Sequence, residues 1–275
     1  MPHLHVGDMA LYYERTGTGQ PLLLIHGLGA STRDWAYQVA YFARHYQVIT
    51  VDLRGHGQSA KPAGPYSIPQ FAADTATLLI SLGSGPAVVV GHSLGGMIAF
   101  ELALRAPTLV RRLVIVNSAP EIPARTVKER LAILLGYCER HVIVHLFGMR
   151  TMGDILSRRL FPNPEQAALR HAFMERYATN QPRAYLAAMH AMRGWSATAR
   201  LASIACPTLV VAAEDDYTSL ASKATYVAQI PQATLITVPH SRHFTPLDQP
   251  HAFNVTLEQF LAHEARAPQE DLING

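Results

Sequence analysis

The 275-residue sequence is poor in the features that define several classes of protein. No uninterrupted apolar run approaches the ~20 residues that a membrane-spanning helix requires, so we expect no integral membrane association. The start of the chain, MPHLH, has neither the basic nor the apolar segment of a cleaved secretion signal. Only two cysteines are present, Cys138 and Cys206, which are too few for a disulfide framework. Together these absences predict a cytoplasmic protein with reduced thiols.

Charge is also scarce and nearly balanced. Charged residues make up 16% of the chain, and the formal net charge is +3. The basic pairs Arg111-Arg112 and Arg158-Arg159 are isolated and have no aromatic residues between them, so the sequence does not predict a nucleic-acid partner. Hydrophobic residues make up 49% of the chain, which excludes a mainly disordered protein. The sequence therefore predicts a globular protein with a large core.

Short apolar runs alternate with helical patterns over most of the chain. Such alternation predicts a mostly parallel sheet with helices on both faces. Two weaker runs near the start, at 3–6 and 10–14, predict an antiparallel hairpin at the sheet edge. The remaining strands are expected at 22–25, 48–51, 87–90, 113–116, 209–212 and 234–238.

The strand pattern is interrupted once. Residues 119–203 show helical patterns only and contain five of the eight methionines. We therefore predict a sheet domain in two parts, 1–118 and 204–264, with a helical insertion at 119–203 and a loose polar tail at 265–275.

One turn between a predicted strand and a predicted helix carries a nucleophile. The sequence there is Gly91-His92-Ser93-Leu94-Gly95. A serine at this turn is forced into a strained backbone conformation that pushes its hydroxyl out of the sheet, and larger side chains at either glycine would collide with the neighbouring elements. The helix that follows offers free backbone N–H groups and the positive end of its dipole.

A serine hydroxyl needs a base, and the base needs an orienting acid. The predicted strand over 208–213 is followed by Glu214, Asp215 and Asp216, and the next strand is followed by His240 and His243. The order serine, carboxylate, histidine, each after a different strand, is the order expected for a sheet enzyme with this turn.

Four motifs together resemble the α/β-hydrolase superfamily, in the neighbourhood of its esterases, enol-lactonases and carbon–carbon hydrolases. They are LIHGLG at 24–29, DLRGHGQS at 52–59, GHSLGG at 91–96 and HF-x-PL at 243–247. The resemblance spans residues 10–262. It implies the α/β-hydrolase fold, with a mostly parallel eight-stranded sheet and an inserted helical cap over the pocket. It also implies Ser93 as nucleophile, His243 as base, Asp216 as acid, and the backbone N–H groups of Leu28 and Leu94 as the oxyanion hole.

Some assignments stay open at the level of sequence. The acid loop, AEDDYTSL at 213–220, lacks the first glycine and the last proline usual in the family, so Asp215 competes with Asp216. His240 is interpreted as a loop histidine, because His243 carries the family motif. His26 and His92 flank the expected oxyanion site, where each either contacts substrate or serves packing.

The expected chemistry needs no cofactor and no metal. His141 and His145 have the helical spacing of two metal ligands, but no third ligand is evident, and no glycine-rich nucleotide motif is present. We expect a serine hydrolase that cleaves an ester, lactone or thioester, with an apolar pocket built from the leucines and methionines of the cap. The same triad could serve a carbon–carbon hydrolase or a perhydrolase, and the scaffold could act as a receptor with slow turnover. Aspartate-nucleophile dehalogenases and epoxide hydrolases are disfavoured by Ser93, and His92 disfavours carbon–carbon cleavage, because many such enzymes have asparagine there.

Overall fold

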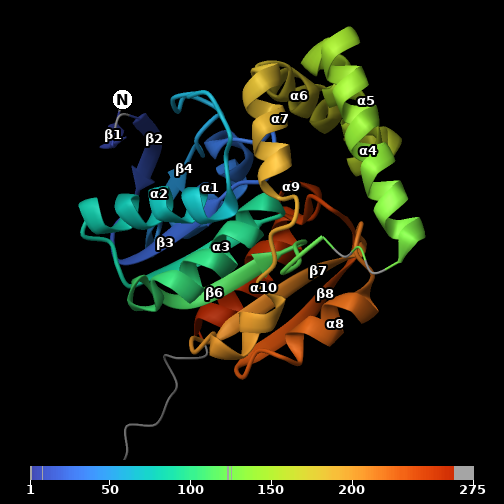
Figure 1. The fold of residues 1–275 in the computed structure, drawn as a ribbon. Coiled ribbons are helices and arrows are strands. Elements are labelled where there is room, and N and C mark those ends of the chain that lie inside the picture. Colours follow the sequence, from blue (N-terminus) through green and yellow to red (C-terminus); the bar gives the residue numbers. More distant parts are fainter. Residues whose placement is uncertain (1, 8, 123, 125, 263–275) are drawn as a thin grey trace, which may run out of the picture.

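The computed structural model describes residues 2–7, 9–122, 124 and 126–262 (Figure 1). A single eight-stranded sheet runs through the molecule in the order β1-β2-β4-β3-β5-β6-β7-β8. All pairs from β4 to β8 are parallel, whereas β1 and β2 form an antiparallel hairpin at one edge. This confirms the predicted sheet. The strands are β1 (His3–Val6), β2 (Met9–Thr16), β3 (Gln20–Ile25), β4 (Tyr46–Val51), β5 (Ala87–His92), β6 (Val110–Val116), β7 (Thr208–Asp215) and β8 (Ala233–Arg242).

Helices cover both faces of the sheet because the central strands are apolar on both sides. Leu23 and Ile25 of β3 pack into one cluster with α2 and α3, while Leu22 and Leu24 pack into another with α10 on the opposite face. Burial of each such side chain contributes about 1.5–3 kcal/mol. The helices of these layers are α1 (Ala36–Phe42), α2 (Ile68–Ser81), α3 (Leu94–Arg105), α8 (Leu220–Val227), α9 (Thr245–Asp248) and α10 (Pro250–Ala262).

Between β6 and β7 the described chain is almost wholly helical. Figure 1 shows the helices of this segment together at the upper right of the molecule, and they are called the cap below. They are α4 (Val127–Leu146), α5 (Gly148–Leu160), α6 (Ala167–Ala178) and α7 (Pro182–Ala191). α4 begins at a capping box, in which Thr126 and Glu129 satisfy each other's backbone N–H groups. The division of the chain at 119 and 203 stays a prediction, and the tail at 265–275 lies outside the described residues.

The cap is held to the sheet domain by packing and by polar contacts. Its apolar core includes Phe244 and Leu247, which belong to the sheet domain. Arg176 of α6 forms an ion pair with Asp34 at 2.8 Å, and Asn180 donates a hydrogen bond of 2.8 Å to the carbonyl of Gly29. The cap therefore contacts the loop that follows β3. Within the described residues, no helix combines the length and apolarity needed to cross a membrane.

One local expectation is wrong. His240 was expected in a loop, but β8 continues past the predicted end at 238 to Arg242, and His240 lies inside it with a φ of 53°. The physical reason is an irregularity in the pairing, after which Asp215 of β7 pairs again with Arg242. His240 remains exposed, and its backbone N–H donates to Glu214.

Candidate active site

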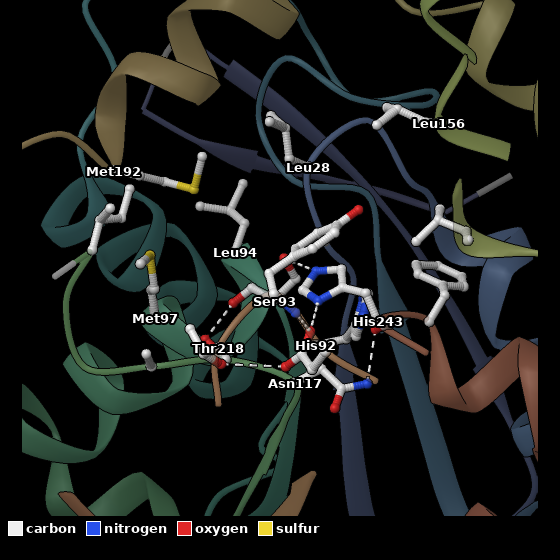
Figure 2. A pocket seen from close by; sticks show the side chains of 18 of the residues that line it. Leu28, His92, Ser93, Leu94, Met97, Asn117, Leu156, Met192, Thr218 and His243 are labelled. Atoms are coloured by element: carbon white, nitrogen blue, oxygen red, sulfur yellow. Dashed lines mark hydrogen bonds and ion pairs between the residues drawn. The ribbon is translucent and has the colours of Figure 1, made fainter. Parts of the chain in front are cut away.

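The turn between β5 and α3 has the strained geometry expected for a nucleophile. Ser93 has a φ of 53°, a region in which residues other than glycine are uncommon. A Cβ atom at Gly91 would collide with the carbonyl of Gly95, and one at Gly95 would collide with the carbonyl of Ile25. Both glycines are therefore required by the close approach of strand and helix. Ser93 consequently stands at the floor of a cavity (Figure 2).

Three side chains from three different strand ends form a continuous chain of hydrogen bonds. His243 Nε2 lies 2.9 Å from Ser93 Oγ, and His243 Nδ1 lies 2.5 Å from Asp216 Oδ1. Because an ionised carboxylate only accepts, the Nδ1 atom of His243 carries the proton and Nε2 is free to accept the serine proton. The geometry is that of a nucleophile, a general base and an orienting acid.

The carboxylate that meets His243 is Asp216. Its second oxygen accepts from the ammonium group of Lys223, whose side chain is 0% exposed. Burial alone would raise the pKa of Asp216, but the hydrogen bonds and charges of His243 and Lys223 outweigh it and hold the pKa well below its ordinary value. Asp216 is therefore ionised at neutral pH. Asp215 instead points to solvent, where it lies 3.4 Å from Arg242.

Asn117, which the sequence reasoning missed, ties the acid and base loops together. It follows β6 with a φ of 46°. Its side-chain amide donates to the carbonyl of His243 at 2.8 Å and to Thr245 Oγ1 at 2.6 Å, and its oxygen accepts from the N–H of Ala213 at 2.7 Å. This residue therefore sets the distance between the end of β7 and the loop that carries the base. The sequence feature that could have identified Asn117 is a polar residue directly after a buried strand.

The two expected oxyanion donors line the same cavity as Ser93. Leu94 is the first residue of α3, so its N–H has no acceptor in a preceding turn of the helix. Leu28 follows β3 on the facing loop, and Figure 2 shows both leucines around the nucleophile. Gly29 has a φ of 74° and is covered by the ring of Tyr177 from the cap. The cap thus fixes the loop that presents Leu28.

The two histidines near the oxyanion site differ in position. His26 does not line the cavity that contains Ser93, because its nitrogens contact the carbonyl of Gly27 at 2.7 Å and the N–H of Leu53 at 3.0 Å. His92 does line it, but its Nε2 donates to the carbonyl of His243 at 2.7 Å. Burial lowers the pKa of His26 to about 4 and that of His92 to about 3, so both rings are neutral. Their geometry fits a packing role.

The cavity has a volume of about 400 Å³ and a largely apolar roof. From the cap, Leu156, Leu160, Phe173 and Met192 line it, and from the acid loop Tyr217 stacks on the ring of His243 with centroids 4.2 Å apart. The other methionines of the predicted pocket do not line it. Met149, Met152 and Met189 are buried in the core of the cap instead.

The remaining polar candidates have structural contacts. Arg54 braces the loop after β4 through a buried ion pair with Asp74 at 2.5 Å. His141 Nε2 contacts His190 Nε2 at 2.7 Å on the cap surface. Within the described ranges, no cluster of three or more histidine, cysteine, aspartate or glutamate side chains could hold a metal ion.

Comparison with known proteins identifies the family of the chain. A family model of the alpha/beta hydrolase fold matches residues 20–250. The RutD protein of Azorhizobium caulinodans, to which carbamate hydrolysis is ascribed, is 34% identical over 94% of this chain and 98% of its own. A 3-oxoadipate enol-lactonase of Acinetobacter baylyi is 28% identical over 91% of this chain and 92% of its own. The crystal structure of the enol-lactonase from Burkholderia xenovorans superposes with a TM-score of 0.86 at 24% identity, covering 95% of this chain and 100% of that one. The chain therefore belongs to the α/β-hydrolase fold family.

Proposed function

We propose that this hydrolase cleaves a carboxylic ester, lactone or thioester through an acyl-enzyme on Ser93. The observation that carries the proposal is the hydrogen-bonded chain from Asp216 through His243 to Ser93 at the floor of one cavity. Leu28 and Leu94, whose backbone N–H groups are the expected oxyanion donors, line the same cavity. These are the parts that acyl transfer requires: an activated nucleophile, a proton carrier and donors for the developing oxyanion.

The acylation step follows from the positions of the protons. Ser93 Oγ attacks the carbonyl carbon while its proton passes to His243 Nε2. The negative charge that develops on the carbonyl oxygen is stabilised by the two backbone N–H groups. Asp216 stabilises the imidazolium cation without taking its proton. The carbonyl then re-forms, the bond to the leaving oxygen or sulfur breaks, and His243 protonates the leaving group.

Deacylation repeats these roles with water as the nucleophile. His243 Nε2 accepts a proton from the water as the water oxygen attacks the acyl carbon. The tetrahedral intermediate collapses, the bond to Ser93 Oγ breaks, and the proton returns from His243 to the serine. Free enzyme and carboxylic acid are the products.

The carbamate chemistry ascribed to the RutD relative supports a second candidate. The same serine could attack a carbamate carbonyl, and His243 would then protonate a leaving amine or alcohol. Carbamates are less electrophilic than esters because nitrogen donates electron density to the carbonyl. A matched ester and carbamate with the same leaving group distinguishes the two by their relative kcat/KM.

The experiment is hydrolysis of p-nitrophenyl esters of increasing acyl length by the wild type, Ser93→Ala and Ser118→Ala. Ser118 supplies the other serine hydroxyl that lines the cavity. We expect turnover to vanish in Ser93→Ala, to persist in Ser118→Ala, and to peak at the acyl length that fits the cavity. Equal rates in the wild type and Ser93→Ala would refute the proposal.

A further inference from the structure

The catalytic cavity contains an arginine that the proposed mechanism does not use. Arg140 of α4 lines the cavity together with Ser93 and His243. Its guanidinium donates one hydrogen bond of 3.0 Å, to the hydroxyl of Tyr185. Within the part of the chain that the structure describes, this is its only hydrogen bond, and it forms no ion pair. A guanidinium has five N–H donors, so most of those of Arg140 have no partner among the described residues.

This arrangement differs from that of other shielded arginines in the molecule. Arg54 pairs with Asp74, and Arg176 pairs with Asp34. A charged group that is removed from water without a counter-ion lowers stability, so arginines at shielded sites are normally paired. The missing anion is the feature that requires an explanation.

The acidic groups of the cavity do not neutralise Arg140. Asp216 already binds His243 and Lys223. Glu121 accepts a hydrogen bond of 2.8 Å from Ser196, and the same two residues form an isolated antiparallel bridge. Among the described residues, the ion pairs of Asp216 are those with Lys223 and His243, and neither Asp216 nor Glu121 pairs with Arg140. The positive charge is therefore available to a bound molecule.

Arg140 shares the cavity that contains Ser93 with two tyrosines, Tyr177 and Tyr217. Tyr177 covers Gly29 on the oxyanion loop, and Tyr217 stacks on His243. Burial raises the pKa of both phenols, and the charge of Arg140 partly offsets that effect at each. The positive charge of Arg140 therefore influences a tyrosine of the cap and a tyrosine of the acid loop. A substrate whose carbonyl group reaches Ser93 can therefore form a second polar contact with Arg140, in the cap.

We propose that Arg140 binds a carboxylate of the substrate, so that the preferred esters or lactones carry a second, ionised acid group. The inference rests on the proposed function for its reaction and on Arg140 for its specificity. A guanidinium matches a carboxylate in a planar, two-bond geometry, and a lysine would not. The apolar residues of the roof then contact the methylene groups between the two ends.

A matched pair of substrates tests the inference. The p-nitrophenyl monoester of adipate and p-nitrophenyl hexanoate have the same chain length and leaving group, and they differ in the terminal carboxylate. We expect the wild type to prefer the adipate ester and Arg140→Met to lose about 10- to 100-fold in kcat/KM on that ester, mainly through KM. The hexanoate should change little. Arg140→Lys should recover only part of the loss, because it keeps the charge without the planar fork.

Controls separate the specific effect from general ones. Lys128 is exposed on the same helix, so Lys128→Met removes the same charge outside the cavity and should leave the adipate preference intact. The melting temperature of Arg140→Met should equal or exceed that of the wild type, since an unpaired cation is removed. A lower melting temperature with equal losses on both esters would show a structural role and overturn the inference.

The outcomes also separate this inference from the proposed function. Ser93-dependent hydrolysis of hexanoate with no adipate preference leaves the serine hydrolase standing and refutes the role of Arg140. If the wild type hydrolyses neither ester, the ester chemistry fails, and calorimetric titration with adipate decides the inference alone. Adipate binding that is lost in Arg140→Met supports the anion site, whereas absent or unchanged binding refutes it.

Discussion

Three buried histidines should make the fold sensitive to acid. Burial lowers the pKa of His26 to about 4 and those of His56 and His92 to about 3, from an ordinary value of 6.5. The contacts fix the neutral state: His26 Nε2 accepts from the N–H of Leu53, and His92 Nε2 donates to the carbonyl of His243. The second nitrogens of His56 and His92 are buried without a partner among the described residues. A second proton on any ring would therefore be buried without an acceptor.

The sign and size of the effect follow from proton linkage. The unfolded chain binds protons on these rings below their ordinary pKa, whereas the folded chain does not until the lowered values are reached. Their contribution to stability is complete above about pH 6.5 and is lost as the pH falls toward about 4. Acidification from about pH 7 to pH 5 lowers the free energy of unfolding by about 2 kcal/mol for each ring and by about 6 kcal/mol for the three together. This is a large part of the 5–15 kcal/mol, roughly, that holds a typical domain together.

Urea unfolding at both pH values, for the wild type and His56→Asn, measures this effect. The asparagine amide can replace the contact of His56 Nδ1 with the carbonyl of Arg54. We expect the loss of unfolding free energy on acidification to shrink by about 2 kcal/mol in the variant, whatever its stability at neutral pH. His251→Asn, at an exposed position, is the control and should keep the full loss. The same loss in the wild type and His56→Asn would refute the reasoning.

Three further outcomes are expected at the catalytic site. Asp216→Asn should lower kcat about 1,000- to 10,000-fold in ester assays, while Asp215→Asn should stay near the wild-type rate; the reverse order would contradict the geometry. Lys223→Met should lower the free energy of unfolding, measured with denaturant, by about 3 kcal/mol, because the buried carboxylate of Asp216 loses a partner. The double variant Lys223→Met/Asp216→Asn should be more stable than Lys223→Met alone, because the unpaired charge is removed. Ser93→Gly should unfold with about 1 kcal/mol more free energy than Ser93→Ala because glycine relieves the strained φ; equal stabilities would argue against strain.

The sheet could be predicted because its signals are local. Runs such as Leu22–Ile25 and Val88–Val90 are apolar on both faces, which only a covered parallel strand accommodates. Ser93 could be predicted as the nucleophile for the same reason, because the strained turn requires glycine at short, fixed spacings on both sides of the serine. The end of β8 was not predicted, since its pairing with β7 resumes only after an irregularity that no residue pattern marks.

The supporting residues of the site depend on contacts that are distant in the sequence. Asn117 and His243 are 126 positions apart, so the hydrogen bond between them follows only from the folded topology. Lys223 lies on helix α8, where a lysine is normally expected to face solvent. The sequence pattern of this helix does not indicate that Lys223 is buried against Asp216. Arg140 resembles any other charge on a helix until the cap is placed over the sheet. Such residues become visible only in three dimensions.

The acyl-enzyme on Ser93 is the central claim, and mass spectrometry tests it most directly. The wild type is mixed with p-nitrophenyl acetate, quenched in acid during turnover and digested. We expect one acetyl group on the peptide that contains Ser93, a burst of p-nitrophenol of one equivalent per active site, and neither signal in Ser93→Ala. Turnover without an adduct, or an adduct on another residue that persists in Ser93→Ala, would contradict the account.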